Sequence, residues 1–465
     1  MLKLTNTMSG QLEEFHPLDD NHVRMYTCGP TVYNFSHIGN FRTYVYEDLL
    51  RRWLKFKGCR LTHVMNITDV DDKTLRDSGA TEVGALKEFT LKFTQAFFED
   101  CKTLNIERPD LVVNATDHIP EMVSLIQKLV RSGHAYERDG SYYFKISTFP
   151  AYGRLAKLDV AGMKLGASVD VDEYEKENVR DFALWKQRKE GELYWDTALG
   201  KGRPGWHIEC SAMSMRYLGE HFDIHCGAVD NIFPHHENEI AQSECATGQP
   251  FVNVWLHGEH LVVNGEKMAK SKGNFFTLRD LTAQGFSPRA IRYTLAAVPY
   301  RKPLNFTFES VHQSHSAIER LEEFLLRVET GHFEPGQNEK IEEKARWARR
   351  RFVESMDDDL NTAQALGAVF ELVHEANVAL AGETLKENNR PTIRGLFADF
   401  QNIFAVLKDP ASQMLEAEIE QLMAERQAAR QSRQFKRSDE IRDQLLARGI
   451  VLEDTKDGVR WKRKD

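Results

Sequence analysis

Two short segments of this chain combine residues that could bind the phosphates of a nucleotide. The first is HIGN, residues 37–40, which lies between a strand-like run and a helix-like run. A glycine at such a turn lets the backbone approach a ligand closely, and the N-terminus of the following helix offers unpaired N–H groups to an anion. The second is EKMAKSKGN, residues 266–274, whose three lysines could neutralise charge on a triphosphate. Taken alone, each segment is more often an ordinary turn or an exposed basic loop.

A third segment, PHHENE at residues 234–239, carries residue types that bind metal ions. If it is helical, His235 and Glu239 lie four residues apart and share one face, so both can reach the same ion. His236 and Glu237 would then point elsewhere. The segment does not match HExxH, so the usual signature of a zinc protease is missing.

Two cysteines could complete a metal site with this pair. Cys28 ends the first predicted strand, and Cys210 starts a helix-like stretch. Two thiolates, one imidazole and one carboxylate would suit tetrahedral zinc. Spacing alone does not select these residues, because other cysteine and histidine candidates exist: Cys226, His207, His225 and His236.

The composition indicates a globular protein of two to four domains. The chain has 465 residues, of which 41% are hydrophobic and 28% charged, and its net charge is −9. This charge argues against a protein that coats nucleic acid, although residues 426–465 hold 12 basic and 7 acidic side chains. No apolar run approaches the roughly 18 residues of a membrane span. The first 20 residues lack the apolar core of a secretory signal, and no CxxC pair occurs, so we expect a cytoplasmic protein with reduced thiols.

Elements that could position these residues follow an alternating pattern. Strand-like runs at 23–28 and 61–67 flank a helix-like run at 43–57, which predicts the start of a parallel sheet. The α/β pattern resumes after residue 205, with strands expected at 222–226 and 251–257. Helices are expected over four further ranges: 82–103, 118–132, 208–218 and 235–246. The sequence therefore predicts a doubly wound α/β domain that is interrupted by an insertion.

The C-terminal third is predicted to be helical. Apolar residues at helical spacing over 311–407 indicate a bundle, with Asn361 or Thr362 as the N-cap of one helix. Two more helices and a hairpin with an Asp-Gly turn are expected after it. We expect this division: 1–137 and 206–257 as the two halves of the sheet domain, 138–205 as the insertion, 258–310 as a connector, 311–407 as the bundle and 413–465 as a C-terminal module.

The two nucleotide segments become specific when they are taken together. HIGN resembles the HIGH motif of class I aminoacyl-tRNA synthetases, and KMAKS resembles their KMSKS motif, in the same order along the chain. Nearly the whole sequence resembles the cysteinyl-tRNA synthetase family. The segments that carry this resemblance are YTCGPTVYNFSHIGN, NITDVDDK, GRPGWHIECSAM, FDIHCGAVDNIFPHHENEIAQS, KMAKSKGNFFTLRD and GIVLEDTKDGVRW. Two positions depart from the motifs: Asn40 replaces the last histidine of HIGH, and Ala269 replaces the first serine of KMSKS.

The resemblance implies a Rossmann-type sheet domain with a connective insertion, a helical bundle and a small C-terminal module. It implies activation of L-cysteine with ATP and Mg²⁺, followed by transfer to the 3′ adenosine of tRNA(Cys). The implied ATP contacts are His37, Gly39, Asn40, Lys267, Lys270 and Ser271, among which His37, Asn40, Lys267 and Lys270 act in catalysis. The implied cysteine contacts are Gly29, Thr68, Trp206 and Asp230. The implied ligands of one Zn²⁺ ion are Cys28, Cys210, His235 and Glu239.

A bound zinc ion would distinguish the thiolate of cysteine from the hydroxyl of serine, which a pocket cannot do well by size. Three alternative functions remain. The cysteine ligase of mycothiol synthesis activates cysteine in the same way but needs no tRNA-binding module. A zinc hydrolase would leave KMAKS unused, and a noncatalytic tRNA-binding protein would not need both the metal set and the phosphate segments. Nothing in the sequence demands a dimer, so a monomer is expected. Trp461 of the basic tail is a candidate for stacking on a tRNA base.

Overall fold

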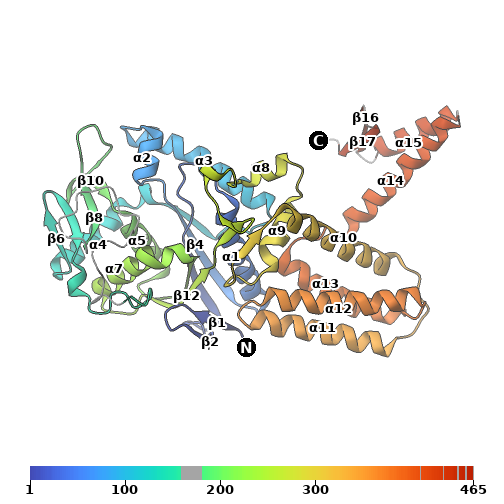
Figure 1. The fold of residues 1–465 in the computed structure, drawn as a ribbon, viewed down its shortest axis with the longest axis horizontal. Helices are drawn as coiled ribbons and strands as arrows, with labels where there is room; N and C mark the ends of the chain where they lie inside the picture. The colour runs from blue at the N-terminus through green and yellow to red at the C-terminus, as the bar shows by residue number, and fades with distance from the viewer. Residues whose placement is uncertain (159–180, 409, 433, 448–449, 456–457, 464–465) are drawn as a thin grey trace.

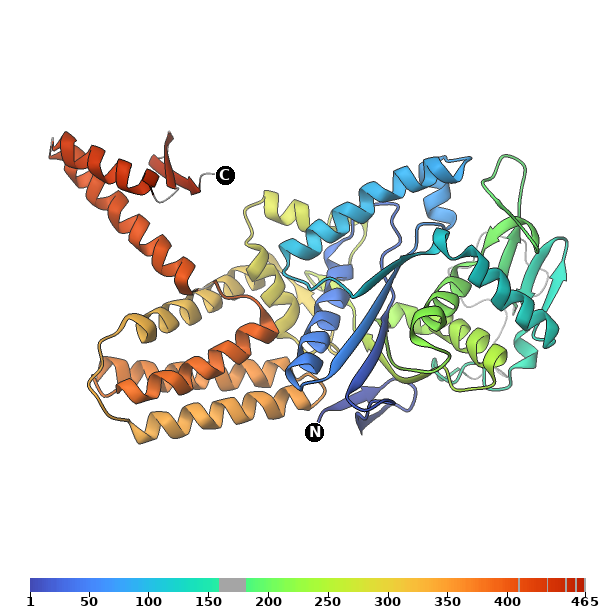
Figure 2. The same ribbon diagram turned by 180° about the vertical axis from the view of Figure 1, so that it is seen from behind.

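The computed structural model describes residues 1–158, 181–408, 410–432, 434–447, 450–455 and 458–463. Figure 1 shows an α/β body on one side, a helical bundle beside it, and a C-terminal helix that leads away from the bundle. Figure 2 shows the same arrangement from behind.

A parallel sheet forms the centre of the α/β body. Its strands follow the order β12-β11-β3-β4-β5. These strands are β3 (His22–Thr27), β4 (Arg60–Ile67), β5 (Leu111–Asn114), β11 (Phe222–Ala228) and β12 (Val252–Gly258). The chain runs outward from β3 to β5 and then returns to β11 on the other side of β3. In such sheets, ligands bind where the strand order reverses, at the carboxyl ends of the strands. That point lies between β3 and β11.

Helices cover both faces of this sheet, which confirms the predicted doubly wound fold. Successive residues of a strand point to opposite faces. Met25 and Met65 therefore pack into the hydrophobic cluster that holds helix α1 (Ile38–Phe56), whereas Tyr26 and Val64 pack into a second cluster. The second cluster also contains side chains of α4 (Ile119–Arg131), α5 (Trp206–Leu218) and α7 (Glu237–Thr247).

Helix α1 begins five residues earlier than the sequence predicts. HIGN is therefore the N-cap and first turn of the helix, not a separate turn before it. The expected helix over 82–103 is present as α3 (Val83–Thr103), but a short helix α2 (Asp72–Ser78) precedes it. The strand β5 was not predicted, and neither was the N-terminal hairpin of β1 (Lys3–Asn6) and β2 (Gln11–Glu14).

The insertion contains an antiparallel sheet with the strand order β6-β7-β8-β10-β9. Its strands are β6 (Ala135–Arg138), β7 (Ser141–Phe144), β8 (Phe182–Gln187), β9 (Trp195–Thr197) and β10 (Gly200–Pro204). The part of the expected insertion at 159–180 lies outside the described residues. Buried Lys186 and Arg203 both form ion pairs with Asp72 of α2, so this sheet is tied to the α/β body.

A small sheet and two helices connect the α/β body to the bundle. The sheet joins β13 (Leu261–Val263), β14 (Glu266–Lys267) and β15 (Leu304–Phe306). After β14 come a 3-10 turn (Lys270–Lys272), α8 (Leu278–Ala283) and α9 (Pro288–Ala297). The other short elements are 3-10 turns at Ala115–Asp117, Ile146–Thr148 and Glu387–Asn389, the helical turn α6 (Val229–Asn231) and a π-helical turn at Ile232–His236.

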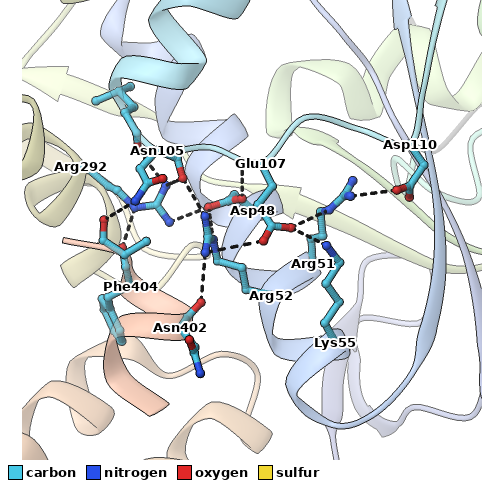
Figure 3. A network of polar contacts seen from close by, with 12 residues as sticks. Asp48, Arg51, Arg52, Lys55, Asn105, Glu107, Asp110, Arg292, Asn402 and Phe404 are labelled. Atoms are coloured by element: carbon cyan, nitrogen blue, oxygen red, sulfur yellow. Dashed lines mark hydrogen bonds and ion pairs between the residues drawn. The ribbon is translucent and has the colours of Figure 1, made fainter. Parts of the chain in front are cut away.

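The predicted bundle is present, and its core is continuous with that of α1. It consists of α10 (Phe308–Thr330), α11 (Glu339–Asp357), α12 (Thr362–Ala381) and α13 (Arg390–Phe404). Asn361 caps α12, because its side chain accepts a hydrogen bond from the N–H of Gln364. A polar network also joins the bundle to α1 (Figure 3): Arg292 pairs with Asp48 at 2.5 Å and donates to the carbonyl of Phe404 at 2.6 Å.

The C-terminal module contains α14 (Pro410–Gln431), α15 (Phe435–Ala447) and the predicted hairpin of β16 (Ile450–Thr455) and β17 (Gly458–Arg463). Thr455 pairs with Gly458, so Gly458 belongs to a strand and the prediction that an Asp-Gly pair forms the turn is wrong. Residues 456–457 and the side chain of Trp461 lie outside the described part of the structure. In the described part, no helix has the length and apolar character of a membrane span.

Candidate functional site

The predicted site residues converge on the sheet edge where the strand order reverses. Cys28 directly follows β3, and the segment 37–40 opens α1 nine residues later. Asp230 lies just beyond the carboxyl end of β11, in the turn α6.

The HIGN segment holds its own backbone in place. The side chain of Asn40 accepts a hydrogen bond from the N–H of His37 at 3.0 Å, and the Nδ1 atom of His37 accepts one from the N–H of Asn40 at 3.2 Å. This reciprocal pair is a capping box, which satisfies free donors at a helix N-terminus. Burial lowers the pKa of His37 to about 4, against the opposing effect of Asp230, so the imidazole is neutral near pH 7. His37 therefore offers a hydrogen bond rather than a positive charge.

The KMAKS segment packs directly on HIGN. A Cβ atom on Gly39 would lie 2.7 Å from the Cε atom of Met268, so the tip of this methionine side chain lies against the start of α1. The N–H of Ile38 donates to the carbonyl of Phe276 at 3.0 Å, and His37 pairs with Thr277 in an isolated β-bridge. Two segments more than 200 residues apart in the sequence are thus in direct contact.

Asn274 shapes the KMAKS loop, although it was not singled out from the sequence. Its side chain accepts from the N–H of Ala269 at 2.8 Å and donates to the carbonyl of Lys267 at 3.2 Å. The side chains of Lys267 and Ser271 are exposed, whereas that of Lys270 lies outside the described part of the structure. The only signal for Asn274 in the sequence is its place at the end of KSKGN.

The four predicted metal ligands meet in one cluster. One ligand atom from each of Cys28, Cys210, His235 and Glu239 lies within 4.8 Å of all the others. The Nε2 atom of His235 lies 3.0 Å from the Oε1 atom of Glu239. The backbone of Phe233 is not helical, but the spacing of four residues between His235 and Glu239 still places both on one face.

The donor atoms of this cluster fit a metal ion better than they fit one another. Within the described residues, the buried Oε1 atom of Glu239 has no hydrogen-bond partner, although Nε2 of His235 is close. The other carboxylate oxygen, Oε2, is held by His225 at 2.9 Å, and the Nδ1 atom of His235 lies 2.9 Å from Nδ1 of His207. Oε2 of Glu239 and Nδ1 of His235 are thus held by neighbouring histidines, while Oε1 of Glu239 and Nε2 of His235 lie close to each other. Neighbouring side chains usually orient metal ligands in this way.

The charges in the cluster alternate. Although burial opposes it, a hydrogen bond from Cys28 lowers the pKa of the Cys210 thiol to about 6. Burial lowers the pKa of His235, but Glu239 and Cys210 outweigh it and raise that pKa to about 10. Burial raises the pKa of Glu239, but His225 and His235 outweigh it and lower that pKa to about 2. Shared protons therefore compensate the negative charges in this cluster, and a metal ion that binds here would displace those protons.

A second candidate group overlaps the first. It consists of Cys28, His225, His236 and Glu239. The Nε2 atom of His236 lies 3.2 Å from the Cys28 sulfur, so the prediction that His236 points elsewhere is wrong. Its Nδ1 atom is 2.8 Å from Nε2 of His257, which fixes the ring. Both groups share Cys28 and Glu239 and differ in their other two members.

Three of the four predicted cysteine contacts lie beside the metal ligands. Trp206 is 36% exposed and stacks on His235, with ring centroids 4.3 Å apart. Gly29 follows Cys28, and a Cβ atom on it would overlap the carbonyl oxygen of Asn66. The side chain of Asn66 bridges the N–H of Gly29 at 2.9 Å and the hydroxyl of Thr68 at 3.0 Å. Asn66 is thus a positioning residue that the sequence interpretation missed.

The fourth predicted cysteine contact, Asp230, lies close enough to His37 to affect its pKa. Its side chain is exposed and is 3.3 Å from the Nε2 atom of His260. Glu209, next to Cys210, was also missed: it is fully buried, and within the described residues neither carboxylate oxygen has a hydrogen-bond partner. Its only signal in the sequence is a charged residue inside the otherwise uncharged stretch IECSAM.

The sequence matches known proteins over the whole chain. Residues 14–316 match the family model of the class I (C) tRNA synthetase catalytic domain. A cysteine–tRNA ligase of Solibacter usitatus is 54% identical, with full coverage of both chains. The chain belongs to the cysteinyl-tRNA synthetase family. A cysteine–tRNA ligase of Koribacter versatilis is 51% identical over the full length of both chains. Residues 351–408 match the DALR domain, and residues 412–461 match the cysteinyl-tRNA ligase anticodon-binding domain.

Solved structures agree on the fold. Methionyl-tRNA synthetase of Mycobacterium tuberculosis bound by methionyl-adenylate superimposes with a TM-score of 0.63 at 14% identity. The match covers 82% of this chain and 92% of that one. The fold is thus that of a class I synthetase.

Proposed function

We propose that this chain is a cysteine–tRNA ligase. It activates L-cysteine with ATP and transfers the cysteinyl group to the 3′ adenosine of tRNA(Cys). The observation that carries the proposal is a cluster of two cysteines, a histidine and a glutamate at the same sheet edge as HIGN, on which the KMAKS segment packs. The full-length similarity to cysteine–tRNA ligases supports it.

We infer that the metal ion is zinc, one per chain, and that its ligands are Cys28, Cys210, His235 and Glu239. When bound, zinc supplies a Lewis acid that prefers a thiolate to a hydroxyl, which suits the selection of cysteine over serine. The neighbouring residues Gly29, Thr68, Trp206 and Asp230 would contact the rest of the amino acid. The stacking of Trp206 on His235 places an aromatic wall over this pocket.

Activation needs no nucleophile from the protein. The carboxylate of cysteine attacks the α-phosphorus of Mg²⁺-bound ATP, the bond to the β-phosphate oxygen breaks, and pyrophosphate leaves. Positioning and charge stabilisation then supply most of the rate. We assign the phosphate contacts to His37, Gly39 and Asn40 at the start of α1.

The KMAKS loop would complete this step. We assign Lys267 and Lys270 to the charge that develops on pyrophosphate, and the Ser271 hydroxyl to a hydrogen bond in the same site. The packing of Met268 against Gly39 supports the proposal, because it holds this loop over the start of α1.

In the second step, a hydroxyl of the terminal tRNA adenosine, the 2′-OH in class I enzymes, attacks the activated carbonyl, and AMP leaves. The bundle (311–407) and the basic module (413–465) would bind the tRNA. The sheet halves (1–137 and 206–257), the insertion (138–205) and the connector (258–310) would carry activation. We propose a monomer that works in the cytoplasm; the cysteines at 28, 59, 101, 210, 226 and 245 are all free thiols, which agrees with a reducing compartment.

The cysteine ligase of mycothiol synthesis is the alternative, and the comparisons do not support it. The match of residues 412–461 to an anticodon-binding domain favours tRNA as the acceptor.

The test is ATP–pyrophosphate exchange with cysteine and with serine, each with and without a zinc chelator. We expect exchange with cysteine alone, and its loss after chelation. Transfer to tRNA(Cys) is then compared with transfer to an amino sugar. Equal exchange with serine, or no transfer to tRNA, would contradict the proposal.

A further inference from the structure

A cavity of about 310 Å³ lies between α1, α3 and the loop of residues 105–109. This volume is at the lower end of the range for small-molecule sites. Its walls are largely aromatic and aliphatic: Tyr44, Met65, Phe97, Phe98 and Ile106. None of the residues assigned above to ATP, cysteine or the metal lines it.

The cavity has a different lining from the synthetase site, although the carboxyl group of Glu47 is close enough to Cys28 to help raise the pKa of that thiol. Its central residue on α1, Glu47, comes nine residues after Ile38, which is about 13 Å along the helix axis. The loop that closes it precedes β5, so it is at the amino edge of the parallel sheet, whereas HIGN and Cys28 are at the carboxyl edge.

Most charged residues around the cavity are already paired (Figure 3). Arg51 binds Glu107 and Asp110, both at 3.0 Å. Asp48 pairs with Arg52 at 2.8 Å and with Arg292 at 2.5 Å. The charges of Asp48 and Arg51 at the rim are therefore already neutralised by ion pairs within the protein.

Glu47 is the exception. It lines the cavity, its residue is only 1% exposed, and neither carboxylate oxygen has a hydrogen-bond partner in the described part of the chain. A buried polar group without a partner is destabilising, so such a group points to an occupant that completes its hydrogen bonds. Burial raises the pKa of Glu47 well above its ordinary value, which favours the neutral, protonated form of its carboxyl group. A neutral carboxyl group presents one O–H donor and one C=O acceptor side by side.

The aromatic walls restrict the shape of an occupant. The rings of Tyr44 and Phe97 meet edge to face, with centroids 4.9 Å apart, and the guanidinium carbon of Arg108 lies 4.4 Å from the ring centroid of Phe98. Flat rings suit such walls. Because the acids at the rim, Asp48 and Glu107, are paired with arginines, they offer no free negative charge to a cationic ligand.

We propose that this cavity binds a small, flat, neutral molecule that presents a hydrogen-bond donor beside an acceptor, such as a cyclic amide or an amino-substituted nitrogen heterocycle. Its donor–acceptor edge meets the carboxyl group of Glu47, and its ring lies against Tyr44, Phe97 and Phe98. The site is independent of the proposed synthetase activity.

The test uses the full chain with 2-pyridone and 2-aminopyridine as probes, and cyclohexanone as a control that only accepts hydrogen bonds. Isothermal titration is expected to detect one site for the two heterocycles and none for cyclohexanone. Glu47→Leu removes both hydrogen-bonding atoms and should weaken binding at least about tenfold. Glu47→Gln keeps a donor beside an acceptor and should bind nearly as well as wild type.

Glu88→Leu is the matched control, because Glu88 is an exposed acid on α3 outside the cavity lining. It should leave binding unchanged. Equal affinity of the wild type and the Glu47→Leu variant would overturn the proposal. If that variant does not fold, crystals of the wild type soaked with 2-pyridone still decide the matter. A ring with its amide edge at Glu47 supports the site, and a cavity that holds only water refutes it.

Discussion

Asn40, which departs from the family motif, provides a sharp test of how the nucleotide segment works. Its side-chain oxygen accepts a hydrogen bond from the N–H of His37 at 3.0 Å, and its amide nitrogen has no hydrogen-bond partner among the described residues. The proposal assigns this nitrogen to a phosphate of ATP. Asn40→Asp keeps the capping oxygen but exchanges the donor for a second, negatively charged oxygen.

Asn40→Asp should preserve or raise the stability of the helix but lower the rate of pyrophosphate exchange. A carboxylate in the first turn of a helix stabilises it by about 0.3–1 kcal/mol, so the melting temperature should stay level or rise. Loss of one hydrogen bond to a charged phosphate costs about 1.5–3 kcal/mol. This corresponds to a decrease of about 10- to 150-fold in pyrophosphate exchange. Repulsion between the new carboxylate and the phosphates adds to the loss.

The assay is ATP–pyrophosphate exchange at saturating cysteine, with thermal melting of the same samples. Asn40→Ala is the control, because it removes the cap as well as the donor. It should lower the melting temperature and the activity together, because it removes the capping-box hydrogen bond to the N–H of His37, which contributes about 0.5–1.5 kcal/mol. If Asn40→Asp exchanges pyrophosphate at the wild-type rate without a change in melting, Asn40 only caps the helix and its assignment to phosphate is wrong.

Three further predictions concern the metal, the buried acid and the C-terminal module. In cobalt-substituted protein, Cys210→Ser should halve the thiolate-to-metal charge-transfer absorption, whereas an unchanged band would assign the ion to Cys28, His225, His236 and Glu239. Burial raises the pKa of Glu47 above its ordinary value of 4.5, so the folded protein retains a proton on this carboxyl group that the unfolded chain releases. The stability of the wild type should therefore fall as the pH rises above 4.5, and Glu47→Gln should abolish this decrease. The melting temperature of Glu47→Gln minus that of wild type should therefore increase from pH 5 to pH 8, and a constant difference would contradict the neutral state of this acid. Deletion of 413–465 should reduce tRNA charging far more than cysteine activation, and equal losses would argue against a separate tRNA-binding role.

Long, strongly patterned elements could be predicted from the sequence. The strands at 23–28 and 61–67 are rich in buried apolar residues, because both of their faces are covered. The strand β5 has only four residues, LVVN, and it forms because β4 offers a paired edge. Similarly, the hairpin of β1 and β2 depends on the burial of Leu2 and Leu4 by distant residues, which a local pattern does not encode.

The chemistry of the site could be predicted, but its exact membership could not. Cysteine, histidine and glutamate indicate a metal site, yet by residue type four other residues were equally suitable as ligands: Cys226, His207, His225 and His236. The choice among them depends on packing across the sheet, which brings His236 within 3.2 Å of Cys28, 208 residues away. The burial of Glu47 is equally a tertiary property: the run YVYEDLL gives no sign that Glu47 lacks a partner while its neighbour Asp48 has three.

The continuous core shared by α1 and the bundle limits how this chain can be divided. The indole of Trp53, near the end of α1, donates to Asp357 at 3.2 Å, and Arg52 donates to the carbonyl of Asn402 at 3.1 Å. Thr5 in the first strand binds Asp359. A fragment that stopped at residue 316, where similarity to the catalytic domain ends, would therefore lose the surface that covers the helix of its own nucleotide site. The bundle is therefore structurally part of the same folded unit as the α/β body. The module beyond α13 is the segment of the chain that recombination could exchange as a unit.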